Sequence, residues 1–373
     1  MVSSPMIVSP RETRVVWHSW RGLVCASLFF VAWLCATCGL GAAALAQEPR
    51  FFRIGTAATG GSFFEIGGFV AGAISSPTDG PSCGHGGSCG VRGLVAVARA
   101  TPGSIENLRL INAGQLESGF AQADLAGWAY TGVNVFAEAG KLRRLRAIAS
   151  LFPEAAHLVV RAESPIHSLA DLVGKKVSFG EAGSGTAADA TVLLAAAGLG
   201  ENNVTRKYLR PGPAAEELKD GSLDALFLVG GYPVPAIRDL ADSIPIRLVP
   251  IEGKIVDALK QDFGFYRGTE IPAGSYPGID TGTPSLGFSA LWLVNADIDS
   301  DLVYAITQSL WHPATAQLLA GLDSIGNRIR LDRALDGLSV PLHPGAARFY
   351  REAGMPVDSA PEAVAEPVER KQP

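Results

Sequence analysis

Short apolar runs of strand length alternate with helix-forming segments over most of the chain. The predicted strands are residues 51–56, 94–98, 117–122, 146–151, 157–160, 176–179, 204–209, 224–229, 246–251 and 286–294. The predicted helices are residues 62–74, 108–111, 124–130, 168–172, 187–197, 214–219, 237–241 and 300–310. Strand and helix in regular alternation are typical of the α/β class with an open sheet.

The alternation occurs twice, which predicts two similar α/β lobes. Residues 153–156 are interpreted as a segment crossing from one lobe to the other, and residues 286–294 as the return strand. We therefore predict a bilobed α/β fold with a two-strand hinge and a ligand cleft at the carboxyl ends of the strands. The predicted parts are a signal peptide (1–46), the first lobe (47–153 and 288–358), the second lobe (154–287) and a disordered tail (359–373).

The N-terminus has the organisation of a secretory signal peptide. Arg11, Arg14 and Arg21 precede an uncharged stretch, Gly22 to Leu45, which ends in the small-residue cleavage pattern Ala44-Leu45-Ala46. The uncharged stretch is also long enough to span a membrane, so an uncleaved anchor is the alternative. Cleavage would leave 373 − 46 = 327 residues, enough for two domains, in an exported protein.

The charge balance narrows the class of partners. The whole chain carries a formal charge of −5, and the signal segment contributes three arginines and one glutamate, so the remainder is near −5 − 2 = −7. A mildly acidic protein of this kind is a poor candidate for non-specific nucleic-acid binding, and we predict no nucleic-acid partner.

Two cysteines remain beyond the signal segment. Cys83 and Cys89 flank a glycine-rich stretch that contains His85. In an exported protein such a pair predicts a disulfide, which closes a short loop and stabilises by roughly 2 kcal/mol. A Cys/His metal site is the less favoured reading, because the loop offers only three ligands.

Two glycine-rich turns each follow a strand and precede a helix. They are residues 54–63 and 177–186, the second containing Gly183-Ser184-Gly185-Thr186. The first N–H groups of a helix have no internal partner and carry partial positive charge, so a carboxylate or phosphate can bind there. The second turn also matches G-x-G-x-x-A, but residues 203–207 offer no acid for a ribose, which disfavours a dinucleotide.

Catalytic patterns are weak by comparison. Ser62 and Ser184 do not lie in G-x-S-x-G, and the histidines show no metal-ligand spacing. We predict a binding protein with no catalytic residue, metal or cofactor. An exported enzyme that uses the same cleft is the second hypothesis.

Seven motifs, in order, resemble the TAXI family of TRAP-transporter solute receptors. They are Thr56–Phe64, Thr101–Asn107, Gln122–Asp124, Gly180–Thr186, Gly221–Ala225, Ile271–Tyr276 and Val340–Ala346. The resemblance covers nearly all of the chain after the signal segment. It implies a type II-like periplasmic binding protein that delivers a small carboxylate, such as glutamate or 2-oxoglutarate, to a TRAP-type membrane permease driven by an ion gradient. A periplasmic sensor for a membrane signalling partner is the alternative.

The resemblance also implies which residues line the cleft. The predicted ligand-binding residues are Thr59, Gly60, Gly61, Ser62, Phe63, Asn107, Gln122, Gly183, Ser184, Gly185, Thr186 and Gly231. Two departures from the family pattern stand out: Ala57-Ala58 replaces Gly-Ser, and Phe63 stands where tyrosine is common. Loss of the phenol removes a hydrogen-bond donor, so the resemblance does not by itself imply glutamate.

Overall fold

The computed structural model describes residues 49–81, 83, 89–262, 265–322 and 324–357. The predicted signal peptide and the predicted disordered tail lie outside these residues. No helix in the described ranges is both long enough and apolar enough to cross a bilayer.

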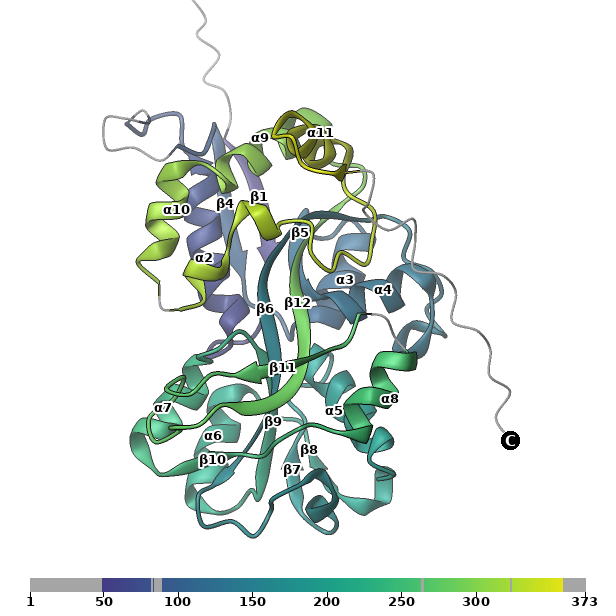
Figure 1. Cartoon of the computed structure of the whole chain (residues 1–373). Coiled ribbons are helices and arrows are strands. Elements are labelled where there is room, and N and C mark those ends of the chain that lie inside the picture. The colour runs from purple at the N-terminus through teal and green to yellow at the C-terminus, as the bar shows by residue number, and fades with distance from the viewer. Residues whose placement is uncertain (1–48, 82, 84–88, 263–264, 323, 358–373) are drawn as a thin grey trace, which may run out of the picture. The chain divides into compact units, whose positions relative to one another are not determined.

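One mixed sheet runs through both lobes (Figure 1), in the order β4-β1-β5-β12-β6-β9-β7-β8. These strands are β1 (Arg50–Gly55), β4 (Leu94–Arg99), β5 (Ser118–Gln122), β6 (Leu145–Arg161), β7 (Lys176–Ser178), β8 (Thr205–Lys207), β9 (Ala225–Gly230) and β12 (Thr283–Asn295). β10 (Ile246–Leu248) pairs with β6, and β11 (Arg267–Ile271) pairs with β12. A separate small ladder joins β2 (Ser75–Ser76) to β3 (Val91–Arg92).

The first lobe holds β1, β4 and β5, which are parallel, and the second lobe holds β7, β8 and β9, also parallel. β6 and β12 are antiparallel to each other and extend from one lobe into the other (Figure 1). The predicted fold class is confirmed: a bilobed α/β protein joined by two long strands. The residue boundaries that we assign to the lobes stay a prediction.

One sequence prediction is wrong at this junction. Residues 146–151 and 157–160 were expected to be separate strands joined by a crossing segment, but β6 is one strand of 17 residues. Pro153 lies inside it, opposite Ser289 of β12. Proline has no N–H to donate to a ladder, yet its backbone angle is compatible with an extended chain, so the strand continues through it.

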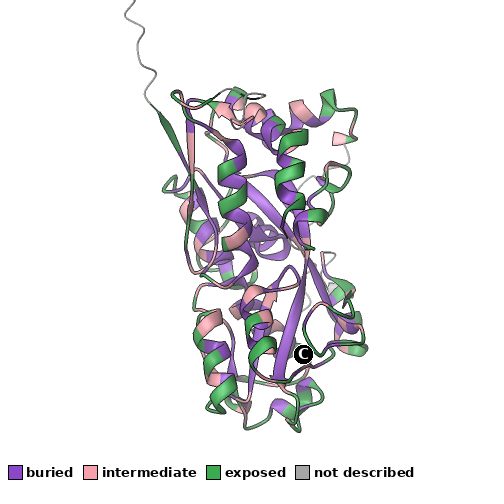
Figure 2. Cartoon of the chain, turned by 90° about the vertical axis from the view of Figure 1, so that its left-hand side faces the viewer, coloured by how far each residue is buried: buried purple, intermediate pink, exposed green. Residues whose placement is uncertain are grey.

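Helices cover the sheet, and their apolar faces point inward (Figure 2). The first lobe carries α2 (Ser62–Ile74), α3 (Ser104–Asn112), α4 (Ala123–Thr131), α9 (Ser300–Leu310), α10 (Pro313–Ala320) and α11 (Pro344–Glu352). The second lobe carries α5 (Gly185–Ala196), α6 (Pro211–Asp220), α7 (Pro235–Ser243) and α8 (Lys254–Asp262). Short 3₁₀ turns lie at Asn134–Phe136, Leu169–Leu172, Glu201–Asn203, Gly326–Arg328 and Leu331–Arg333.

Aromatic side chains join α2 to the sheet near the junction of the lobes. The ring of Phe63 packs edge-on against Phe120 of β5, with centroids 5.7 Å apart, and against Phe152 of β6 at 6.2 Å. Phe120 in turn contacts Trp292 of β12. Such pairs contribute about 0.5–1.5 kcal/mol beyond the area that they bury, so the start of α2 is held rigidly beside the cleft.

The predicted disulfide between Cys83 and Cys89 is confirmed, with the two Cα atoms 4.7 Å apart. It lies between β2 and β3 in the sequence, within the first lobe. Its part is therefore local to the first lobe.

Asn107 ties three backbone segments of the first lobe together. Its side chain is fully buried, and Nδ2 donates to the carbonyls of Thr56, at 2.7 Å, and Phe120, at 2.9 Å. Oδ1 accepts from the Thr101 hydroxyl at 2.8 Å. These bonds fix the end of β1 against α3 and β5, and so position the first glycine turn.

We expect Asn107→Ala to lower the free energy of unfolding by about 1–3 kcal/mol, because the buried carbonyls of Thr56 and Phe120 each lose the amide donor. The Thr56 carbonyl keeps its bond from the Thr101 hydroxyl. Asn107→Asp should cost more, since it buries a charge and places oxygens against oxygens. Urea unfolding followed by circular dichroism measures both changes.

Asn112→Asp is the matched control. Asn112 Oδ1 accepts from the Arg144 backbone N–H at 3.0 Å, and a carboxylate can still accept there. Equal losses in the free energy of unfolding for Asn107→Asp and Asn112→Asp would contradict the proposal that Asn107 holds β1 and β5 together.

Candidate functional site

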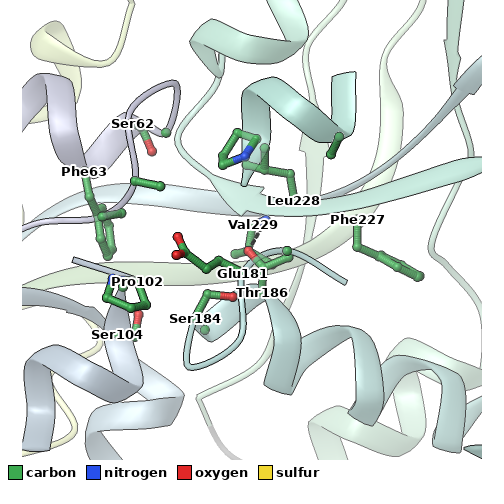
Figure 3. Close-up of a pocket in the computed structure, with 18 of the residues that line it drawn as sticks. Ser62, Phe63, Pro102, Ser104, Glu181, Ser184, Thr186, Phe227, Leu228 and Val229 are labelled. Atoms are coloured by element: carbon green, nitrogen blue, oxygen red, sulfur yellow. Dashed lines mark hydrogen bonds between the residues drawn. The ribbon is translucent and has the colours of Figure 1, made fainter. Parts of the chain in front are cut away.

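A cleft lies between the lobes, at the carboxyl ends of their parallel strands. Three turns, strand β9 and the start of α6 line it, and Figure 3 labels part of this lining. The polar and charged lining residues are Ser62, Ser104, Gln122, Glu154, Ser178, Glu181, Ser184 and Thr186. Apolar residues such as Phe63, Pro102, Phe227 and Leu228 supply the remaining surface. A concave, mostly apolar site with a few convergent polar groups is typical of a small-molecule binding site.

The second-lobe wall is the start of α5. Ser184 caps this helix, since its Oγ accepts from the Ala187 N–H at 3.1 Å. Thr186 Oγ1 accepts from the Val229 N–H of β9 at 3.0 Å, a bond drawn in Figure 3. Gly180 and Gly183 have φ of 80° and 82°, a conformation that glycine adopts without strain. The turn is therefore fixed at both ends, with helix N–H groups at the cleft.

The first-lobe wall is the start of α2, which begins after Gly61 with no side-chain cap. Ser62 Oγ accepts from the Gly231 N–H of the second lobe at 3.1 Å. The Ala236 N–H donates to the Gly60 carbonyl at 3.1 Å, also across the lobes. These bonds hold the lobes together along one side of the cleft.

A third segment, Pro102 to Ser104, closes the other side. The Glu106 N–H donates to the Gly183 carbonyl at 3.4 Å. The Ser104 hydroxyl donates to Gln122 Oε1 at 3.1 Å, and Gln122 Nε2 donates to Asp189 of α5. The structure is therefore a closed form, in which both sides of the cleft are bridged by polar contacts between lobes.

Gly185 and Gln122 approach each other with no space for a side chain at position 185. A Cβ placed on Gly185 would lie 1.4 Å from Gln122 Oε1. A methyl group at position 185 would therefore displace the Gln122 side chain from its hydrogen bonds to Ser104 and Asp189.

The structure brings seven of the predicted ligand-binding residues to the cleft surface: Gly61, Ser62, Phe63, Gln122, Ser184, Gly185 and Thr186. The other five lie elsewhere. Thr59 and Gly60 line a separate depression against α6 and α7, and Asn107 is enclosed by backbone. Gly183 precedes the lining residue Ser184 in the chain, and the Gly231 N–H donates to the lining residue Ser62.

Three acidic residues near the cleft were not predicted from the sequence: Asp124, Glu154 and Asp189, each 1% exposed. Burial raises the pKa of Asp124 to about 6, and it raises the pKa values of Glu154 and Asp189 well above their ordinary range. The sequence does single out Asp189, because it is the one charged residue within the alanine- and leucine-rich helix α5.

Within the described residues one group has the spacing of metal ligands: Cys83, Cys89 and His312. The two sulfur atoms are joined in the disulfide, which removes the thiolates that a metal would need. The group also lies outside the cleft lining.

The chain belongs to the NMT1-like family, whose model matches residues 54–354. Among solved structures it resembles the alkanesulfonate-binding protein SsuA from Xanthomonas axonopodis pv. citri bound to MOPS, with 17% identity over 83% of this chain and 82% of that chain, at a TM-score of 0.44. It also resembles an ABC uptake transporter substrate-binding protein from Streptococcus pneumoniae with bound histidine, with 14% identity over 77% and 97% of the two chains and a TM-score of 0.43.

We expect Gly185→Ala to prevent full closure, because its methyl group meets the Gln122 amide. Size-exclusion chromatography coupled to small-angle X-ray scattering should show a larger radius of gyration than for the wild type. Gln122→Ala removes the obstructing atoms, so the double variant should regain the compact form.

Gly212→Ala is the control, since no atom lies within 4 Å of a Cβ at that position. A Gly185→Ala protein as compact as the wild type would contradict the predicted clash.

Proposed function

We propose that the protein is an extracytoplasmic solute receptor that captures a small carboxylate in the interlobe cleft. The observation that carries this proposal is the placement of two helix N-termini, those of α2 and α5, on opposite walls of the cleft. Each presents backbone N–H groups and a serine hydroxyl. An anion held between them would favour closure of the lobes.

The donors suffice without a basic side chain. No lysine or arginine is among the described residues that line the cleft. A micromolar solute needs about 8 kcal/mol, and a partly buried helix terminus contributes up to ~2 kcal/mol. Hydrogen bonds to a charged group add roughly 1.5–3 kcal/mol each before the entropy cost of binding.

The acids in the cleft are compatible with an anionic solute. Glu181 pairs with Arg210 at 3.2 Å. Burial raises the pKa of Glu154, which favours its neutral form, so that this side chain does not repel a carboxylate. Family membership and the seven TAXI-like motifs support a transport role over catalysis.

We further propose that the receptor delivers its solute to a TRAP-type membrane permease. The support is the resemblance of the glycine turns and of the Gln122–Asp124 segment to the TAXI pattern. Glutamate and 2-oxoglutarate are the first solutes to test. Phe63 offers them no phenol donor, unlike the tyrosine that is common at this position in the TAXI pattern.

Ligand-stripped protein should gain thermal stability with a small carboxylate at saturating concentration, by roughly 2.7 kcal/mol at a hundredfold excess over Kd. A differential scanning fluorimetry screen of amino acids, oxoacids and dicarboxylates measures this gain. No shift with any of them would contradict carboxylate capture.

The Thr186 hydroxyl distinguishes cleft binding from binding elsewhere. Thr186→Val should weaken the best carboxylate about tenfold or more in isothermal titration calorimetry, because a charge-assisted bond worth roughly 1.5–3 kcal/mol is lost. Thr186→Ser keeps the hydroxyl and is the matched control. Equal affinities for the two variants would remove this turn from the site.

Uptake of the identified solute by cells should require this protein and an ion gradient. Ionophores should abolish uptake, whereas vanadate, which blocks ATP-driven transport, should not. Uptake that survives loss of the gradient would overturn the TRAP assignment. Normal uptake in cells lacking the protein would favour a sensing role.

A further inference from the structure

Three carboxyl groups meet beside the cleft, each from a different element. Asp124 is in the first turn of α4, Asp189 is in α5, and Glu154 is in β6. All three are buried, and among the described residues no lysine or arginine forms an ion pair with any of them.

Asp124 and Asp189 come from opposite lobes and contact each other. Their carboxyl groups are close enough to share a hydrogen bond, and both oxygens of Asp124 and Oδ1 of Asp189 are buried without a hydrogen-bond partner in the described part of the chain. Because two carboxylates only accept, a bond between them requires a proton on one of them. Gln122 Nε2 donates to Asp189 Oδ2 from the first lobe, so the amide and one carboxyl oxygen are already matched. The other oxygen, Oδ1, is buried without an N–H donor from the described chain, and a proton placed there can be donated to Asp124.

Glu154 is a third buried acid beside the cleft. Its side chain is 1% exposed and lines the cleft, and its Oε2 atom has no hydrogen-bond partner in the described part of the chain. A buried ionised carboxylate without a partner is costly, so this group also favours a bound proton. Its charge, when present, acts against ionisation of Asp189.

Among the described residues, the groups that face the pair do not supply a compensating positive charge. The Asp124 carboxyl faces the N–H groups of Asp124 and Leu125 and the Tyr266 hydroxyl. On α8, which packs against α5, Lys254, Asp257 and Lys260 are exposed to solvent.

The charged residues at the ends of β6 are bonded elsewhere. Arg146 donates to the Arg143 and Leu145 carbonyls, and Arg161 pairs with Glu163. On α3, which packs against α4, Glu106 is half-buried, and Arg109 is exposed and lies over the Phe136 ring. On β6, His157 bonds to the Ala155 and Leu228 carbonyls and the Tyr276 hydroxyl. No titratable residue lies on β5, β9 or β12.

We propose that Asp124 and Asp189 form a proton-binding site that is complete only when the lobes are closed, so that closure takes up a proton from solution. In the open form each carboxyl would face water and ionise as usual. In the closed form one proton is shared between them as an O–H···O⁻ bond. This inference does not rest on the identity of the solute.

The direction of the pH effect follows. Burial and the neighbouring carboxylate raise the pKa of Asp189 in the closed form, and burial raises that of Asp124 to about 6. The closed form therefore binds more protons than the open form above about pH 4, the ordinary pKa of an aspartate. Closure is therefore favoured at low pH. The equilibrium constant for closure falls by about tenfold per pH unit for each proton taken up, until the pH has passed the raised pKa values.

Small-angle X-ray scattering of the solute-free wild type, measured from about pH 5 to pH 8, tests the proposal. We expect the ratio of closed to open molecules to fall by at least tenfold as the pH rises, so that the radius of gyration increases. The series is repeated with choline chloride in place of sodium chloride. An unchanged pH response supports a proton, whereas closure that requires sodium would overturn the proposal in favour of a metal cation.

Asp189→Asn tests the contribution of the acid pair, because it removes the titrating group and keeps a side chain of the same shape. Its amide oxygen can still accept from Gln122, and its amide N–H can donate to Asp124, as the protonated acid does. We expect a much weaker pH response, with the closed form persisting at pH 8. Asp257→Asn, on the exposed face of α8, is the matched control and should respond as the wild type does.

Two results would overturn the proposal. One is a wild-type radius of gyration that does not change with pH. The other is an Asp189→Asn protein that opens with the same pH midpoint and slope as the wild type. The wild-type series alone decides the first point, so the test does not depend on the variant folding.

Discussion

The shared backbone ladder of β6 and β12 is the constraint on which the rest of the structure depends. These strands are paired over nine positions and belong to both lobes at once. The lobes therefore cannot separate as independent bodies, and their relative motion must bend or twist this ladder. With the junction held in this way, the carboxyl ends of the two parallel strand sets face one another, which is why the cleft forms there.

The sequence predicts the order of the elements well where the pattern is local. Helices 62–74 and 300–310 match α2 and α9 to the residue, since glycine or aspartate marks their starts. The long strand β6 was divided wrongly, because Pro153 is normally a sign of interruption. The helices α8, α10 and α11 and the strands β2, β3 and β11 were missed. For α8 a signal existed, since Ile255, Val256 and Leu259 have helical spacing.

In the candidate site, too, the features set by local sequence were predicted and those set by long-range packing were missed. The two glycine turns are local in sequence, and each lies where the pattern predicts, immediately before the start of a helix. The acidic residues were missed, because nothing near Asp124 in the sequence indicates that Asp189 will be packed against it by closure. Gln122 links the two features, since its side chain contacts Ser104 and Asp189 and leaves no room for a side chain at Gly185. Solute binding and protonation would thus act on the same side chain.

Pro153 has a mechanical consequence. Where it faces Ser289 the ladder lacks one donor, and Gly287 pairs with Ala155 two residues further along β6. Pro153 and the register shifts at Ala290–Leu291 and Trp292–Leu293 are the irregular points of this ladder, where regular pairing offers least resistance to bending. Glu154 is next to Pro153, so one of these points lies beside a buried acid. Bending stress applied to the lobes would be concentrated on a few residues, while the paired regions on either side move as rigid levers.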